Sequence, residues 1–203
     1  MAIVMIGGHS RNVGKTSVVA GLIAAMPSCH WTAVKITQFG NAICSRDGQP
    51  CDCATADHSW AISEERQASD KTDTARFLLA GAARSLWVRT QQGRLAEAIP
   101  DLRHHLAGAR NIIVESNSAV KFLRPDLYLA VLDPATEDFK DSSRQFLDRA
   151  HALVVQSGAE SPRWKNVSAA LLAAKPKFYV QPPQYVSDEM VRFVREKMGE
   201  PPP

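Results

Sequence analysis

The segment from Gly7 to Ser17, GGHSRNVGKTS, restricts the possible folds of this chain more than any other feature. It follows an apolar run at residues 3–6 and leads into a helical pattern at residues 15–25. An apolar strand, a glycine-rich loop ending in Gly-Lys-Thr and a helix, in this order, are typical of a phosphate-binding loop. In such a loop, backbone N–H groups and the positive end of the helix dipole face phosphate oxygens. The alternative interpretation is an ordinary glycine-rich turn that caps a helix.

The loop is one residue longer than the usual pattern G-x-x-x-x-G-K-[ST]. His9 stands where the first glycine is expected, and Gly8 precedes it by one position. If the segment binds phosphate, Lys15 lies against the β and γ phosphates, and Thr16 offers its hydroxyl to a magnesium ion. We expect His9 to be an exposed loop residue. The other residues expected to contact a nucleotide in this segment are Gly8, Arg11, Asn12, Val13, Gly14 and Ser17.

Short apolar runs alternate with amphipathic stretches along the rest of the chain. Seven runs that are apolar on both faces are typical of the buried strands of a parallel sheet; they lie at residues 2–7, 31–37, 84–90, 111–116, 127–133, 152–157 and 177–181. Six helical patterns accompany them, at residues 15–25, 73–82, 95–106, 142–149, 164–174 and 187–198. This alternation predicts an α/β fold with a doubly wound, mostly parallel sheet of about seven strands. Ligands of such sheets bind at the carboxyl ends of the strands.

Length and composition indicate one globular domain. The chain has 203 residues, of which 45% are hydrophobic and 22% charged, and its formal net charge is +3. We expect a single domain over residues 1–198 and a frayed tail at residues 199–203. The small net charge gives no support for nucleic acid or a membrane surface as a partner, and no apolar run reaches the ~20 residues of a membrane span. Because a signal-peptide pattern is also lacking, we expect a cytoplasmic protein.

Two acidic residues are candidates for binding the magnesium ion. Glu115 follows the buried run NIIV, so that its carboxylate falls at the carboxyl end of a strand, where P-loop proteins usually place such a group. The alternative is a surface glutamate that begins a loop. Asp73 precedes a helical pattern and either caps that helix by accepting a backbone N–H or faces the magnesium ion or an acceptor substrate.

The segment at about residues 40–72 interrupts the alternation and is too long for a plain connection. It contains Cys44, Cys51, Cys53 and His58, which could form a tetrahedral zinc site because thiolates and imidazole suit Zn(II). Their spacing is irregular, so unliganded reduced cysteines and a redox or catalytic thiol are the alternatives.

Several motifs resemble those of known families. The loop GHSRNVGKT resembles the G-T-D-T-x-V-G-K-T loop of dethiobiotin synthetases, which also has five residues between its glycines. The segment from Asp73 to Ala82 resembles the motif D-[ST]-x-R-x-x-x-A-G-A of the molybdopterin-guanine dinucleotide biosynthesis protein B (MobB) family. That family also has strands reading V-K-H and V-E-G, which are similar to residues 34–36 and 114–116. The resemblance covers roughly the first 130 residues and implies the fold of a P-loop NTPase.

The resemblance to MobB implies a protein that binds a nucleoside triphosphate with Mg²⁺, hydrolyses it weakly and acts as an accessory factor in molybdenum cofactor biosynthesis. It favours GTP over ATP, although the chain has no N-K-x-D motif and Gln156 is the candidate contact to the base. Two other functions stay open: an ATP-dependent small-molecule ligase or kinase of the dethiobiotin synthetase type, and a metal-insertion GTPase that uses the Cys and His segment. A partner protein of cofactor biosynthesis and a homodimer are further expectations.

Overall fold

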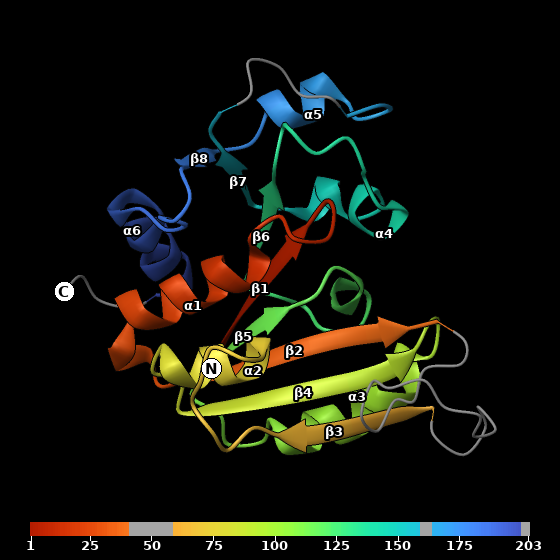
Figure 1. The fold of residues 1–203 in the computed structure, drawn as a ribbon, viewed down its shortest axis with the longest axis vertical. Helices are drawn as coiled ribbons and strands as arrows, with labels where there is room; N and C mark the ends of the chain where they lie inside the picture. Colours follow the sequence, from red (N-terminus) through yellow and green to blue (C-terminus); the bar gives the residue numbers. More distant parts are fainter. Residues whose placement is uncertain (41–58, 159–163, 200–203) are drawn as a thin grey trace.

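A computed structural model of the chain describes residues 1–40, 59–158 and 164–199. An eight-stranded sheet in the order β3-β4-β2-β5-β1-β6-β7-β8 forms its centre (Figure 1). All neighbouring strands are parallel except β3 and β4, which are antiparallel. The strands are β1 (Ala2–Gly8), β2 (Trp31–Phe39), β3 (Trp60–Glu64), β4 (Arg84–Gln91), β5 (Asn111–Glu115), β6 (Leu127–Leu132), β7 (Ala152–Gln156) and β8 (Lys177–Val180).

Helices cover both faces of the sheet, so the doubly wound α/β fold is confirmed. They are α1 (Lys15–Ala25), α2 (Asp73–Leu79), α3 (Leu95–His105), α4 (Asp141–Arg144), α5 (Ala169–Ala173) and α6 (Asp188–Met198), with 3₁₀ turns at Pro27–Cys29, Ser118–Lys121 and Leu147–Arg149. On one face, α1, α2 and α6 bury their apolar side chains in one core cluster. On the other face, α3 and the segments after β5 and β6 form a second cluster. Successive residues of β1 alternate between the two, with Val4 and Ile6 in the first and Met5 in the second.

The eighth strand, β3, lies within the segment that was expected to be an insert. It was missed because only Trp60 and Ile62 are large and apolar, and the strand is at most half-buried at the edge of the sheet. Ile62 pairs with Val88 of β4 in antiparallel register. The four proposed zinc ligands, Cys44, Cys51, Cys53 and His58, lie outside the described residues.

Three helices are shorter than their patterns indicated. The helix predicted to end at Ala82 ends at Leu79, because Gly81 adopts a positive φ of 101°. The pattern at residues 142–149 divides into α4 and a 3₁₀ turn, and the pattern at 164–174 forms only the short helix α5. None of these differences touches the carboxyl ends of β1, β2 and β5.

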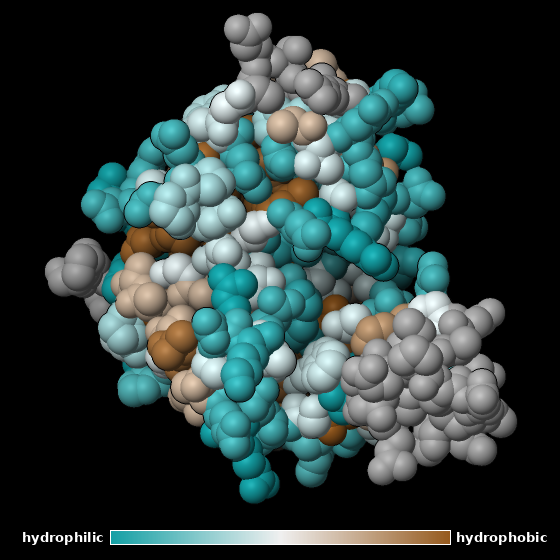
Figure 2. Space-filling view, in the orientation of Figure 1, coloured by the Kyte–Doolittle hydropathy of each residue, from teal (hydrophilic) through white to brown (hydrophobic). Residues whose placement is uncertain are grey.

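In the parts of the chain that the structure describes, no helix is both long enough and apolar enough to cross a bilayer. On the face shown in Figure 2, hydrophobic residues form only small patches among hydrophilic and intermediate ones.

Candidate nucleotide site

A cavity of about 910 Å³ opens at the carboxyl ends of β1, β2 and β5. Its volume is within the usual range of small-molecule sites, and its position is the one expected for ligands of parallel sheets. The loop between β1 and α1 forms one wall, and the ends of β2 and β5 form another. We call residues 7–17 the phosphate loop from here on. The loop residues that line the cavity are Ser10, Arg11, Asn12, Gly14, Lys15, Thr16 and Ser17.

The end of the phosphate loop leaves the first turn of α1 without a side-chain cap. Gly14 is the N-cap residue, and its φ of 82° lies in the left-handed region that favours glycine. The first N–H groups of a helix have no partner within the helix, and here no side chain of the N-cap residue accepts from them. They can therefore bind an anion, which the helix dipole also favours.

The start of the loop is fixed by Asn117, which follows β5. Its Oδ1 accepts the Gly8 N–H at 2.7 Å, and its Nδ2 donates to the Gly8 carbonyl oxygen at 2.8 Å. A Cβ on Gly7 would lie 2.5 Å from Asn117 Oδ1 and 2.5 Å from the Tyr128 hydroxyl, so both glycines permit a close approach of the backbone. The Gly8 N–H is thus used within the protein, and the predicted contact of Gly8 with a nucleotide stays a prediction.

His9 is fully buried, so the expectation of an exposed side chain was wrong. Its Nε2 accepts the Asp133 N–H at 3.0 Å, and its Nδ1 donates to the Asp138 carbonyl oxygen at 2.7 Å. These two bonds assign the neutral tautomer with the proton on Nδ1. Burial lowers the pKa of His9, which keeps the ring neutral at pH 7. The extra residue of the loop therefore anchors the loop to the segment after β6.

Lys15 bends back over the phosphate loop and donates to the Ser10 carbonyl oxygen at 2.6 Å. Burial lowers the pKa of this lysine to about 8; Glu115 opposes the shift, and the charges of Lys35 and Lys140 add to it. A buried ammonium beside other cations is stabilised by an anionic ligand. The position of Lys15 is therefore suited to phosphate.

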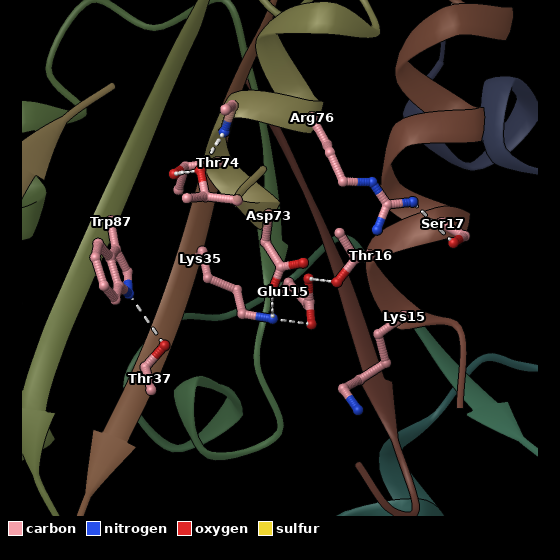
Figure 3. A network of polar contacts seen from close by, with 12 residues as sticks. Lys15, Thr16, Ser17, Lys35, Thr37, Asp73, Thr74, Arg76, Trp87 and Glu115 are labelled. Carbon is pink, nitrogen blue, oxygen red and sulfur yellow. Dashed lines mark hydrogen bonds and ion pairs between the residues drawn. The ribbon is translucent and has the colours of Figure 1, made fainter. Parts of the chain in front are cut away.

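Thr16, Lys35, Asp73 and Glu115 converge on one point beside the phosphate loop (Figure 3). The Thr16 hydroxyl donates to Glu115 Oε2 at 2.9 Å, and Lys35 Nζ bonds to Glu115 Oε1. Lys35 Nζ also lies 2.8 Å from Asp73 Oδ2. The Glu115 side chain is only 2% exposed, so the reading of this residue as a surface glutamate was wrong.

The charges in this network hold one another. Burial alone would lower the pKa of Lys35, but the carboxylates of Glu115 and Asp73 outweigh it and raise the pKa. Burial alone would raise the pKa of Asp73, but Lys35 and a hydrogen bond with Thr16 lower it. Asp73 does not cap α2; the Thr72 hydroxyl does so by accepting the Ala75 N–H at 3.2 Å.

The donor set fits a magnesium ion. Thr16, Glu115 and Asp73 offer a hydroxyl and two carboxylates, which are the hard oxygen ligands that Mg²⁺ prefers. The ammonium of Lys35 already lies between the two carboxylates, so a cation is accommodated at this point. Among the described residues, no group of three or more His, Cys, Asp and Glu side chains is arranged to hold a metal ion.

The remaining predicted contacts line the loop from other sides. Gln156, at the end of β7, donates to the Val13 carbonyl oxygen at 2.9 Å and so supports the loop from behind. Arg76 of α2 donates to the Ser17 hydroxyl at 3.2 Å. Tyr185 lines the cavity and lies so close to Gly14 that a Cβ there would overlap its ring. Sequence reasoning did not identify Asn117 or Lys140, because neither belongs to a motif and both reach the loop through tertiary contacts.

Comparison with known proteins gives structural matches only. No protein-family model and no curated protein sequence matches the chain. HypB from Helicobacter pylori, solved in complex with nickel, is similar over 97% of this chain and 86% of that chain, with a TM-score of 0.52 and 14% identity. The signal recognition particle receptor FtsY from Elizabethkingia anophelis matches at 16% identity and a TM-score of 0.41, over 80% of this chain and 52% of that one. The first likeness supports the predicted α/β fold of the P-loop NTPase type.

Proposed function

We propose that this chain binds a nucleoside triphosphate with magnesium at the carboxyl ends of β1, β2 and β5 and hydrolyses it slowly. The observation that carries the proposal is the arrangement of Lys15, Thr16 and Glu115 around one cavity, with the uncapped start of α1 beside them. A triphosphate requires a cation and N–H donors for its phosphates and hard oxygen ligands for its metal ion. An ordinary glycine-rich turn requires neither a partly buried lysine nor a buried glutamate.

Each residue has a role that follows from its position. The N–H groups at the start of α1 bind phosphate oxygens, and the Lys15 ammonium offsets the charge that develops as the terminal phosphate bond breaks. Thr16, Glu115 and Asp73 would hold the magnesium ion, which neutralises phosphate charge when it is bound. Both carboxylates pair with Lys35, so their oxygens are already engaged and neither is positioned as a general base for the attacking water. Slow hydrolysis follows from this pairing.

Release of inorganic phosphate tests this activity. We expect phosphate release from GTP or ATP at a rate on the order of 10⁻² s⁻¹ or slower, as for other P-loop proteins without an activating partner, and loss of release in EDTA. Glu115→Gln should lower the rate at least about tenfold, because a carboxamide is a poorer magnesium ligand. Glu64→Gln, on the edge strand β3, is the matched control and should retain the rate. Equal rates for the unchanged protein and Glu115→Gln would contradict the assignment of Glu115.

We further propose that the protein is a MobB-like accessory factor of molybdenum cofactor biosynthesis that uses GTP. Residues that carry the resemblance to MobB support this, because they gather at the cavity: Lys35 pairs with both Asp73 and Glu115, and Arg76 contacts the loop at Ser17. Calorimetric titration with GTP and with ATP, both with magnesium, distinguishes this role, and that of a metal-insertion GTPase, from an ATP-dependent ligase. At least tenfold tighter binding of GTP supports the MobB-like role, whereas tighter binding of ATP contradicts it.

A ligase or kinase of the dethiobiotin synthetase type is the second candidate, and the extent of the cavity favours it. The cavity continues past the phosphate loop to Thr37 and Gln38 at the end of β2 and to Ser118 after β5. This space could hold a small acceptor next to Lys35. A ligase or kinase would release phosphate or form a phosphorylated product only with its acceptor present, whereas a slow NTPase releases phosphate in buffer alone.

A further inference from the structure

The segment after β6, residues 133–140, packs directly on the phosphate loop and is held there by His9. The ring of His9 bonds to the Asp133 N–H and to the Asp138 carbonyl oxygen, which brings the two ends of a turn together. The Lys140 N–H in turn donates to the His9 carbonyl oxygen at 2.8 Å. Because His9 is fully buried, these three bonds fix the backbone of Lys140 relative to the loop.

The side chain of Lys140 lines the same cavity as Arg11, Lys15 and Lys35. Of these four cations, Lys35 is paired with Glu115 and Asp73. Within residues 1–40, 59–158 and 164–199, no ion pair involves Arg11, Lys15 or Lys140. Three cations that line the cavity thus have no carboxylate paired with them among the described residues.

In the protein alone, Lys140 is repelled by both of the other cations. Burial and then the charge of Arg11 lower the pKa of Lys140, and Asp138 opposes the shift. Lys140 in turn contributes to the lowered pKa of Lys15. The charge of Lys140 thus acts on Lys15 and on Lys35, which are the lysines beside Glu115 and Thr16. An anion at this end of the cavity would relieve the repulsion among all of them.

We infer that Lys140 binds the terminal phosphate of the nucleoside triphosphate, as a further cation that the segment after β6 delivers to the phosphate loop. The inference rests on the proposed function and extends it, because no phosphate-loop motif includes this lysine. It also explains the additional residue of the loop: His9 is the positioning residue that holds the backbone of Lys140. Lys15 and the start of α1 also contact the β phosphate, which a diphosphate retains, whereas Lys140 contacts the terminal phosphate alone and so distinguishes triphosphate from diphosphate.

Calorimetric titration of Lys140→Met tests the inference. The probes are GMPPNP and AMPPNP, each with magnesium, and the corresponding diphosphates GDP and ADP. Lys140→Met should weaken binding of the preferred triphosphate analogue at least about tenfold, as expected for the loss of one charge-assisted contact, and should change binding of the diphosphate by less than about threefold. Lys177→Met is the matched control, because Lys177 is the first residue of the edge strand β8 and does not line the cavity. This variant should bind the triphosphate analogue and the diphosphate as the unchanged protein does.

Two further variants keep the test decisive. Lys140→Arg retains the charge and should bind the triphosphate analogue within about threefold of the unchanged protein, with an unaltered thermal midpoint. Unaltered triphosphate binding by Lys140→Met, or an equal loss for triphosphate and diphosphate, would overturn the inference. If Lys15→Ala still abolishes binding in that case, the proposed function stands without it. Failure of the unchanged protein to bind any of the four nucleotides would overturn both.

Discussion

The substitution Lys35→Met removes the ammonium that pairs with both Glu115 and Asp73. The side chains of Lys35, Glu115 and Asp73 are 18%, 2% and 38% exposed, so the Lys35–Glu115 pair is largely buried and Asp73 is partly solvated. The pKa of Lys35 is raised, because the two carboxylates outweigh burial, and the pKa of Asp73 is lowered, because Lys35 outweighs burial there. The substitution therefore leaves a buried carboxylate without its cation.

Breaking a buried ion pair on one side costs about 3–5 kcal/mol. We expect the lower end, about 3 kcal/mol, because Glu115 keeps its bond from the Thr16 hydroxyl and Lys35 is not completely buried. For a domain of this size, each kcal/mol shifts the thermal midpoint by about 2–4 °C, so the midpoint should fall by about 6–12 °C. The Lys35–Asp73 pair stabilises the protein from above the ordinary pKa of aspartate up to the raised pKa of Lys35, and pH 7 lies within this window.

The effect of magnesium distinguishes a metal site from a structural ion pair. Without Lys35, the carboxylates of Glu115 and Asp73 have no competing cation, so Mg²⁺ should stabilise Lys35→Met more than the unchanged protein. The gain is about 1.4 kcal/mol at ten times the dissociation constant. Urea unfolding at pH 7, in EDTA and at rising magnesium concentrations, measures the free energy of unfolding. It therefore gives both the cost of the substitution and the gain from magnesium. Lys165→Met, which breaks an exposed pair with Glu137, should leave the midpoint unchanged. Full stability of Lys35→Met in EDTA, or equal stabilisation of both proteins by magnesium, would refute this reasoning.

Three other predictions follow from the phosphate loop. Gly7→Ala should lower the free energy of unfolding by about 2–3 kcal/mol in urea titrations, because the added Cβ meets Asn117 and Tyr128, whereas Gly40→Ala, with open space around it, should not. His9→Phe should lower the free energy of unfolding by about 3 kcal/mol in urea titrations, because two backbone groups lose their partner. The control His104→Phe, at an exposed position, should leave the urea midpoint unchanged. Equal urea midpoints for the two variants would contradict the anchoring role of His9. Triphosphate affinity in saturating magnesium should fall about tenfold from pH 7 to pH 9. The reason is that Lys15 loses its proton near pH 8 in the free protein and must regain it on binding. A calorimetric affinity that does not change between pH 7 and pH 9 would contradict this.

The fold was predictable where local patterns coincide with burial on both faces. The apolar runs of β1, β5 and β6 are continuous and short, as buried strands of a parallel sheet are. Helix α1 begins at Lys15 because Gly14 supplies the left-handed turn that precedes it. β3 was not predictable, because an edge strand with one half-buried face needs only two large apolar residues. Its place in the sheet depends on pairing with β4, which is a tertiary contact.

The candidate site shows the same division. Thr16 and Glu115 were identified because each stands at the carboxyl end of a strand or at the start of the helix that follows, and such positions meet at one edge of a parallel sheet. His9 was misjudged because its partner Asp133 is 124 positions away in the sequence, and nothing in the loop itself indicates burial. Lys140 depends on the same contact, so no local pattern could have revealed it.

Calorimetric titration of the unchanged protein and of Lys15→Ala with magnesium and GMPPNP or AMPPNP tests the central claim most directly. Lys15 donates to the Ser10 carbonyl oxygen within the loop, so its removal should leave folding intact while eliminating the main cation at the phosphates. We predict a dissociation constant in the micromolar range or below for the unchanged protein and at least about a hundredfold weaker binding for Lys15→Ala. Equal affinities of the two proteins, with both folded, would contradict the assignment of this segment as a phosphate-binding loop.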